Sequence, residues 1–227
     1  MLLIQIPTLD NIDELLNKIQ EISNELINID YEFLIVDHSK INYSEQINLF
    51  KNEKKLKKIN YYHLKKKSKK NERGLASRFG YIKALDLHEY VDLIELDSDN
   101  AHSAKEILKI YNHAKENKCE IVIASKYLKG SKVLNRKYSR VLISAIYNFL
   151  NKKIFGLKIS DTTNGYRYYS KSALSNYTNL KLEFITPIGH LLMLVVNHSK
   201  NLKFGEIESF YSENINYKSS INIKQLF

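Results

Sequence analysis

The amino-acid sequence predicts an α/β domain built on a mainly parallel sheet that helices cover on both faces. Short, almost continuous apolar runs recur through the first half of the chain, as expected of parallel strands buried on both faces. Segments with apolar residues at helical spacing separate these runs, which is typical of βαβ units. No linker-like stretch interrupts the 227 residues. We therefore expect a single domain over residues 1–227.

Strands and helices are expected in turn along the first half. The helices space their apolar residues three or four positions apart, whereas the strands are rich in Ile, Leu and Val. Before the first helix, Asp10 or Asn11 is the expected N-cap, because both side chains can accept a hydrogen bond from the first turn. The expected strands lie at residues 2–7 (closed by Pro7), 31–37, 58–64, 92–97 and 120–125, and the helices at residues 8–27, 71–88 and 103–117.

The pattern changes in the second half. A long helix is expected at residues 136–159, followed by a polar, turn-rich segment at residues 160–170. A further helix is expected at residues 183–201, broken or begun near Pro187. A late strand is expected at residues 202–211.

Composition limits the class of protein. The net charge of +10 favours anionic partners such as nucleotide phosphates, nucleic acid or anionic lipid. The single cysteine, Cys119, excludes an intrachain disulfide and fits a reducing compartment. The first residues do not have the pattern of a signal peptide, and the longest apolar runs are shorter than a membrane span. We expect a cytoplasmic protein, in solution or peripheral to the inner face of a membrane.

Polar or turn-forming residues close four of the expected strands: Pro7, Asp37, Asp97 and Ser125. The carboxyl ends of parallel strands share one edge of the sheet, and ligands of α/β proteins bind beyond that edge. These residues are therefore expected to converge on a ligand site. Strand ends also carry polar residues simply because they meet water, and for Asp37 alone that interpretation is the better one.

Two aspartates, Asp97 and Asp99, directly follow the strand expected at residues 92–97. In extended backbone, residues two apart project to the same side, so both carboxylates can converge on one cation. Hard oxygen ligands suit Mg²⁺ or Mn²⁺, which keep waters and take further ligands from substrate phosphates. The alternative is a solvated acidic loop.

One stripe of the long helix is polar, because Arg140, Ser144 and Asn148 recur at every fourth position. An arginine and a serine one turn apart can clamp a phosphate, the arginine through charge-assisted hydrogen bonds. The alternative is an ordinary amphipathic helix, whose polar face meets water and whose apolar face packs on the protein.

A lysine-rich stretch covers residues 51–73 and includes Tyr61, Tyr62 and His63. It could attract an anionic membrane surface or nucleic acid. A solvated loop and sheet edge, where lysines prevent aggregation, explains it as well. We favour the solvated loop, place membrane attraction second, and expect no nucleic-acid partner.

A series of motifs in a fixed order carries a family resemblance. They are IQIPTLDNIDELLNKI, FLIVDHSK, GLASRFGYIKAL, IELDSDNAH, EIVIASKYLKG, RVLISAIYNFLNKKIFGLKISDTTNGYRYYSKSAL and EIESFYSENINYKSS. Together they resemble family 2 glycosyltransferases with the GT-A fold, a Rossmann-like sheet flanked by helices. Within that family the chain is most similar to polyprenyl-phosphate sugar transferases of the dolichyl-phosphate mannose synthase type.

The resemblance implies a nucleotide-binding half at residues 1–125. Pro7 belongs to its opening turn, and Asp37 would contact the nucleobase or ribose of a GDP- or UDP-sugar. Asp97 and Asp99 would hold Mg²⁺ or Mn²⁺ on the diphosphate.

An acceptor-binding half is implied at residues 126–227. Its implied residues are Lys126, Arg140 and Ser144 on the acceptor phosphate, Asp161 and Arg167 around the sugar and acceptor, and Lys218 on a tail closing over phosphates. The expected catalytic residues are Asp99, Asp161 and Arg140. The chain departs from the family pattern at Ala101, where relatives have a metal-contacting Gln, and at Lys126, where they have an Arg.

The implied activity is inverting, metal-dependent transfer of a sugar to a polyprenyl phosphate. A phosphate acceptor is already a nucleophile, so the reaction needs no strong general base. Such a lipid acceptor implies peripheral membrane docking or a membrane-bound partner. Two alternatives stay open: transfer to a glycan or protein hydroxyl, with Asp161 or Glu183 as the base, and a non-catalytic basic binding module on a degenerate transferase fold.

Overall fold

The computed structural model describes residues 1–56, 58–65, 73–89, 91–99, 101–180 and 188–213. In the first half, strands and helices alternate as predicted, with one helix, α2, that was not expected. The elements are β1 (Leu2–Thr8), α1 (Ile12–Glu25), β2 (Tyr31–Asp37), α2 (Ser44–Glu53), β3 (Ile59–His63), α3 (Arg73–Leu87), β4 (Asp92–Glu95), α4 (Glu106–Glu116) and β5 (Ile121–Ser125).

The second half contributes more regular structure than the sequence predicts. Its elements are β6 (Lys132–Leu134), α5 (Tyr138–Phe155), β7 (Arg167–Ser170), α6 (Lys171–Thr178), α7 (Ile188–Ser199), β8 (Phe204–Glu208) and β9 (Phe210–Ser212). The expected late strand is divided at Ser209 into β8 and β9, which join different sheets. Pro187 and Glu183 lie outside the described residues.

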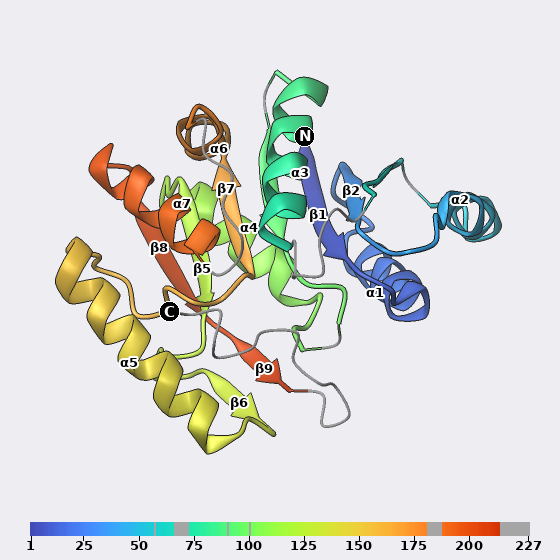
Figure 1. Ribbon diagram of the computed structural model, residues 1–227. Coiled ribbons are helices and arrows are strands. Elements are labelled where there is room, and N and C mark those ends of the chain that lie inside the picture. The colour runs from blue at the N-terminus through green and yellow to red at the C-terminus, as the bar shows by residue number, and fades with distance from the viewer. Residues whose placement is uncertain (57, 66–72, 90, 100, 181–187, 214–227) are drawn as a thin grey trace.

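A central sheet has the strand order β3-β2-β1-β4-β7-β5-β8 among the described residues (Figure 1). All its neighbouring strands run parallel except β7, which is antiparallel to both β4 and β5. The predicted mainly parallel sheet is confirmed. Since β7 runs the other way, its first residue lies at the edge where the parallel strands end. A separate two-stranded ribbon joins β6 and β9.

Apolar cores cover both faces of the sheet. On one face α1 and α4 pack against the strands through residues such as Ile19 and Ile107. On the other face α3, α6 and α7 contribute Ala84, Leu174 and Leu194. Helix α5 lies along one flank of the molecule, next to β6 (Figure 1).

Two local expectations differ from the structure. Pro7 does not close β1, which continues to Thr8; β4 pairs only as far as Gln5, so Pro7 lies where β1 has a neighbour on one side. The segment expected to be irregular at residues 160–170 contains β7. Tyr168 and Tyr169 face opposite cores, so two aromatic residues that resemble polar loop positions form a strand buried on both faces.

The N-cap of α1 is Asn11, one of the two predicted residues, and its side-chain oxygen accepts from the Glu14 backbone N–H at 3.4 Å. Among the helices of the described residues, none combines the length and the apolar character needed to cross a membrane.

Candidate active site at the carboxyl edge of the sheet

The predicted ligand edge is formed by the ends of β1, β2, β4 and β5, together with the start of β7. Thr8 at the end of β1 donates its hydroxyl to Ser98 at 3.4 Å. Asn164, before β7, donates to the Ala124 backbone oxygen of β5. Contacts of Lys126 with Asp161 and of His102 with Tyr166 join the segments at residues 97–99, 101–102, 125–131 and 160–166 at one edge, as the strand pattern predicts.

Asp97 and Asp99 lie in the turn after β4. Asp97 is paired with Arg73 of α3, whose Nε donates to Oδ1 at 2.7 Å. Asp99 accepts from the Ala101 backbone N–H at 3.1 Å. Burial, together with the negative charge of Asp97, raises the pKa of Asp99 to about 6. The two carboxylates thus repel each other in a partly desolvated turn.

This pair of carboxylates fits a hard divalent cation. A cation between them would remove the repulsion that raises the pKa of Asp99. Within the described ranges, no group of three or more His, Cys, Asp or Glu side chains could hold a metal. Asp97 and Asp99 would therefore supply two oxygen ligands, and water or ligand phosphates the others.

Arg73 links the turn to a buried cluster below it. Its Nη2 lies 3.2 Å from the carboxylate of Glu95, which is fully buried at the end of β4. Ser77 donates to this carboxylate at 2.8 Å, and Tyr81 donates to it as well. Burial opposes ionisation, but hydrogen bonds, first of all that from His190, and the charge of Arg73 outweigh it and lower the pKa of Glu95 to about 2. The cluster is an ionised anchor for Arg73.

Asp37 lies at the end of β2, fully buried. Its Oδ1 accepts from the Ser39 backbone N–H at 2.8 Å and from the Ser39 hydroxyl, and its Oδ2 accepts from Tyr61 at 2.6 Å. Ser39 in turn accepts from the Asp10 backbone N–H. Asp37 therefore shapes the loop after β2, and its contact with a ligand stays a prediction.

Lys126 and Asp161 form a buried ion pair on the other side of the edge. Lys126 Nζ lies 3.0 Å from Asp161 Oδ2, and the two side chains are 6% and 0% exposed. Burial raises the pKa of the Asp161 carboxyl, but the Lys126 charge and several hydrogen bonds outweigh it and lower this pKa to about 2. Burial also lowers the pKa of Lys126, and Asp161 offsets this in part.

The loop that carries Asp161 is held from two sides. Asp161 Oδ1 accepts from the backbone N–H groups of Thr163 and Asn164 at 2.9 and 3.0 Å. Glu206 of β8 accepts from the Asp161 and Ser160 backbone N–H groups at 3.1 and 2.8 Å. Each of these bonds ties backbone to a carboxylate, so the loop has one well-determined shape.

The polar stripe of α5 faces this loop. Asn148 accepts from the backbone N–H and hydroxyl of Thr162 at 2.8 and 2.7 Å. Ser144 lies 2.6 Å from the Tyr127 hydroxyl and 3.3 Å from that of Thr163. Both side chains are buried. The alternative of a polar face exposed to water is wrong, because the stripe is the face that α5 packs on the protein.

Two further predicted residues are placed as follows. Arg140, in the first turn of α5, forms an ion pair with Glu213. Arg167 is fully buried and donates to the backbone oxygens of His190 and Thr162 at 3.1 and 2.9 Å, so it supports the loop from below. Lys218 lies outside the described residues.

Tyr211 of β9 is a site residue that the sequence did not reveal. Its ring lies 5.1 Å from that of His102, and Lys126 Nζ lies 5.4 Å from its centroid. Burial raises the pKa of Tyr211, the charge of Asp99 adds to this, and Arg140 opposes it. Tyr211 thus lies between the aspartate turn and the cationic side of the edge. A lone tyrosine in a polar stretch gives no sequence signal, since only the pairing of β9 with β6, outside the central sheet, brings it here.

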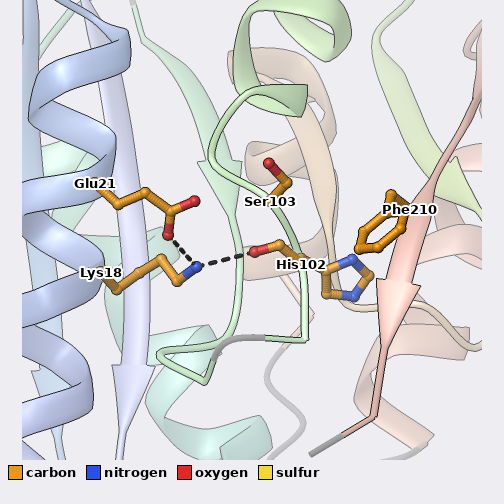
Figure 2. A pocket seen from close by; sticks show the side chains of 5 residues that line it. All are labelled: Lys18, Glu21, His102, Ser103 and Phe210. Atoms are coloured by element: carbon orange, nitrogen blue, oxygen red, sulfur yellow. Dashed lines mark hydrogen bonds and ion pairs between the residues drawn. The ribbon is translucent and has the colours of Figure 1, made fainter. Parts of the chain in front are cut away.

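The loop after Asp99 is held by α1. Lys18, fully buried, donates to the His102 backbone oxygen at 2.9 Å and lies 2.6 Å from Glu21 (Figure 2). Glu21 also accepts from the Ala104 backbone N–H. Figure 2 shows these groups lining a pocket with Phe210 of β9 opposite Lys18. Lys18 and Glu21 fix the turn and do not face the ligand edge, and neither residue was predicted.

The family model of glycosyl transferase family 2 matches residues 4–178. The chain belongs to this family. It is 31% identical over 85 residues to a polyprenol monophosphomannose synthase of Mycolicibacterium smegmatis, covering 37% of this chain and 32% of the relative. It is 29% identical over 85 residues to an undecaprenyl-phosphate mannosyltransferase of Micrococcus luteus, covering 37% of this chain and 34% of the relative. These matches thus span about a third of each curated relative.

Solved structures share the fold. The S. aureus TarS 1–349 structure has a TM-score of 0.59 at 16% identity and covers 93% of this chain and 60% of that one. Glucosyl-3-phosphoglycerate synthase from Mycobacterium tuberculosis, solved in complex with Mn²⁺, UDP and glucosyl-3-phosphoglycerate, has a TM-score of 0.58 at 12% identity, covering 100% of this chain and 74% of that one. The expected GT-A fold is confirmed.

Proposed function

We propose that this family 2 protein transfers a sugar from a nucleotide-diphosphate sugar to a polyprenyl phosphate, with inversion at the sugar. The curated relatives are named for polyprenol and undecaprenyl-phosphate mannose transfer, which supports a lipid-phosphate acceptor. The observation that carries the proposal is the position of Tyr211, which contacts the loop after Asp99 and the cationic groups Lys126 and Arg136. A donor site and an acceptor site would then share one edge.

The donor is proposed to bind over the ends of β1, β2 and β4, in a nucleotide-binding half at residues 1–125. The loop that Asp37 and Ser39 shape would receive the nucleoside, and the turn at Asp97 and Asp99 the diphosphate. Bound to these two carboxylates, Mg²⁺ or Mn²⁺ would stabilise the negative charge that develops on the departing nucleoside diphosphate. A UDP-sugar is supported by solved relatives in complex with UDP-GlcNAc or UDP, and a GDP-sugar stays open.

The acceptor phosphate is proposed to bind on the other side, in the half at residues 126–227. Arg140 and Lys126 carry the positive charge there, and each is paired with a carboxylate, Glu213 and Asp161. An incoming phosphate would replace Glu213 on Arg140, where the side chain is 38% exposed. Ser144, one turn along α5, would add a hydroxyl donor.

A phosphate oxygen needs no general base, because it is already anionic. Asp161 has the features of a structural anion: it is buried, paired with Lys126 and has a pKa lowered to about 2. Such a carboxylate is too weak a base to remove the proton of an acceptor hydroxyl efficiently. This argues against transfer to a hydroxyl with Asp161 as the base. Glu183, the other proposed base, lies outside the described residues. We also propose that the protein acts in the cytoplasm, at the inner face of the membrane that holds the lipid acceptor.

A transfer assay tests this function. Purified protein would be incubated with UDP- or GDP-sugars, Mn²⁺ and a short-chain polyprenyl phosphate in detergent, with lipid-linked sugar measured by mass spectrometry. We expect a polyprenyl-phosphate sugar from at least one donor, and no product with Asp99→Asn. Transfer to a glycan in place of the lipid, or product formation by Asp99→Asn at the wild-type rate, would refute the proposal.

A further inference from the structure

Helix α5 exposes its apolar face. Of the large hydrophobic residues that are exposed in the described part of the chain, more than half lie on this one helix. They are Tyr138 (81%), Leu142 (50%), Ile143 (37%), Ile146 (50%), Phe149 (60%), Leu150 (46%), Ile154 (68%) and Phe155 (37%). Phe155 lies on the side of the helix that carries Asn148 and Asn151, so we call the other seven residues the α5 apolar face. Contiguous exposed apolar surface of this kind marks an interaction site.

The orientation of α5 explains why this face is outside. The residues that the helix buries are polar: Ser144, Asn148 and Asn151. Asn148 and Asn151 bond Thr162, and Ser144 bonds Tyr127. Turning the apolar face inward would break these buried hydrogen bonds, so the helix is held with its apolar residues toward solvent.

The segment that carries the α5 apolar face has charges of one sign. From residue 126 to residue 160 the chain has nine Lys or Arg residues and no Asp or Glu, and two of the nine, Lys126 and Arg140, are paired with carboxylates from outside the segment. Lys137 precedes the helix, Lys152 and Lys153 lie in its last turns, and Lys158 follows it, all of them exposed. An apolar helix face with cations at both ends matches the pattern of helices that lie in the interface of anionic membranes.

We propose that the α5 apolar face docks on an anionic lipid surface, with the apolar side chains inserted and the lysines on the headgroups. Charge complementarity favours lipid over a second copy of the chain, since two copies of this surface would each bring an excess of positive charge. The surface differs from the lysine-rich stretch at residues 51–73, which the sequence had suggested for membrane attraction.

Docking would also serve the proposed function, and this consequence rests on it. Arg140 and Ser144 lie on the same helix as the α5 apolar face. A helix lying in the membrane interface would hold these two residues within a helix diameter of the headgroups, where the phosphate of a polyprenyl phosphate lies. The acceptor would then reach the site without leaving the bilayer.

Vesicle flotation tests the docking. The full chain would be mixed with vesicles of phosphatidylcholine alone or with phosphatidylglycerol added. We expect binding to the phosphatidylglycerol vesicles, and at least a ~10-fold lower partition coefficient for the double variant Ile146→Ser/Phe149→Ser, because two inserted side chains are lost. Lys152→Glu/Lys153→Glu should weaken binding in a salt-dependent way.

The matched control is Ile27→Ser/Leu49→Ser, which removes two residues of the other half that are 74% and 64% exposed. It should bind vesicles like the wild type. Equal binding by the two serine double variants would overturn the proposal. So would a lipid-free dimer, measured by light scattering, that Ile146→Ser/Phe149→Ser dissociates, since a second copy would then be the occupant.

The two proposals can fail separately. Transfer to a short-chain acceptor in detergent does not need docking, so loss of vesicle binding with transfer retained removes only the docking surface. Vesicle binding without sugar transfer to any lipid phosphate removes only the proposed function.

Discussion

Arg73 places two nitrogens on one carboxylate oxygen of Asp97, Nε at 2.7 Å and Nη2 at 2.6 Å. The same guanidinium lies 3.2 Å from buried Glu95. The first aspartate of the turn after β4 is thus tied through Arg73 to an anion in the core. This connection fixes the turn before any ligand arrives, which is the condition for a site that binds without reorganisation.

Removing Arg73 should destabilise the protein strongly. In Arg73→Met, Glu95 keeps its charge but loses its cationic partner inside the core. The expected loss is about 3 kcal/mol in the free energy of unfolding, measured by urea denaturation at pH 7.5. The control is Lys83→Met on the same helix, whose pair with Asp86 is largely exposed, so we expect a change below about 1 kcal/mol. Similar losses in both variants would show that Arg73 is not an anchor.

Stability should fall as the pH drops below about 6.5, the usual pKa of histidine. Burial and the charge of Lys126 lower the pKa of His102 to about 3, so between these values the unfolded chain takes up a proton that the folded protein does not. Between pH 7.5 and pH 5, His102 should contribute a loss of ~2 kcal/mol. Asp99, with its pKa raised to about 6, works in the opposite direction over part of this range.

Comparison with His102→Gln isolates the histidine. Urea denaturation at both pH values should give a drop in the free energy of unfolding for the wild type that exceeds the drop for the variant by about 2 kcal/mol. Equal drops would mean that His102 titrates normally in the folded protein.

Arg140→Gln should impair the acceptor side alone. If Arg140 binds the acceptor phosphate through a charge-assisted hydrogen bond, transfer to polyprenyl phosphate should fall roughly 10- to 100-fold. Nucleotide-sugar binding, followed by thermal shift, should be unchanged. Lys137→Gln, three residues earlier and exposed, is the control. If both substitutions lowered transfer equally, the loss would reflect the overall positive charge of the protein and not a bond from Arg140 to the phosphate.

Helix α5 packs on the protein through its polar face, and this predicts an unusual pattern of stability changes. Asn148→Ala removes the acceptor for two bonds from Thr162, leaving a buried N–H unsatisfied, and should cost about 1–3 kcal/mol. Its neighbour Phe149, which is 60% exposed, should tolerate Phe149→Ser within about 0.5 kcal/mol. A larger loss for Phe149→Ser, measured by urea denaturation, would mean that the helix packs through its apolar face.

The sequence predicted the first half of the fold well because its strands are apolar runs and its helices are periodic. Asp37, Asp97 and Ser125 follow strands that end at one edge, so their convergence follows from parallel pairing alone. Residues 160–178 were harder, because tyrosines in β7 are buried on both faces but resemble loop residues. The orientation of α5 could not be read from periodicity, which gives the two faces of a helix but not which one is buried.

The site was predictable where a residue's role depends on its own strand, and not where it depends on distant pairing. Asp97 and Asp99 could be proposed from their spacing. Arg73, Tyr211 and Lys18 reach the turn from α3, β9 and α1, and their contacts arise only when the chain closes on itself. Lys126 and Asp161 were both predicted, but not their mutual pairing across 35 residues.

Metal-dependent nucleotide binding tests the role of Asp97 and Asp99 most directly. Thermal unfolding of the wild type, Asp99→Asn and the exposed control Asp86→Asn would be measured with UDP- and GDP-sugars, with and without Mn²⁺. We predict that at least one nucleotide sugar raises the melting temperature of the wild type and of Asp86→Asn only when Mn²⁺ is present, and that Asp99→Asn loses this shift. Stabilisation of Asp99→Asn equal to that of the wild type, or no Mn²⁺-dependent shift with any nucleotide sugar, would contradict a metal-assisted donor site at this turn.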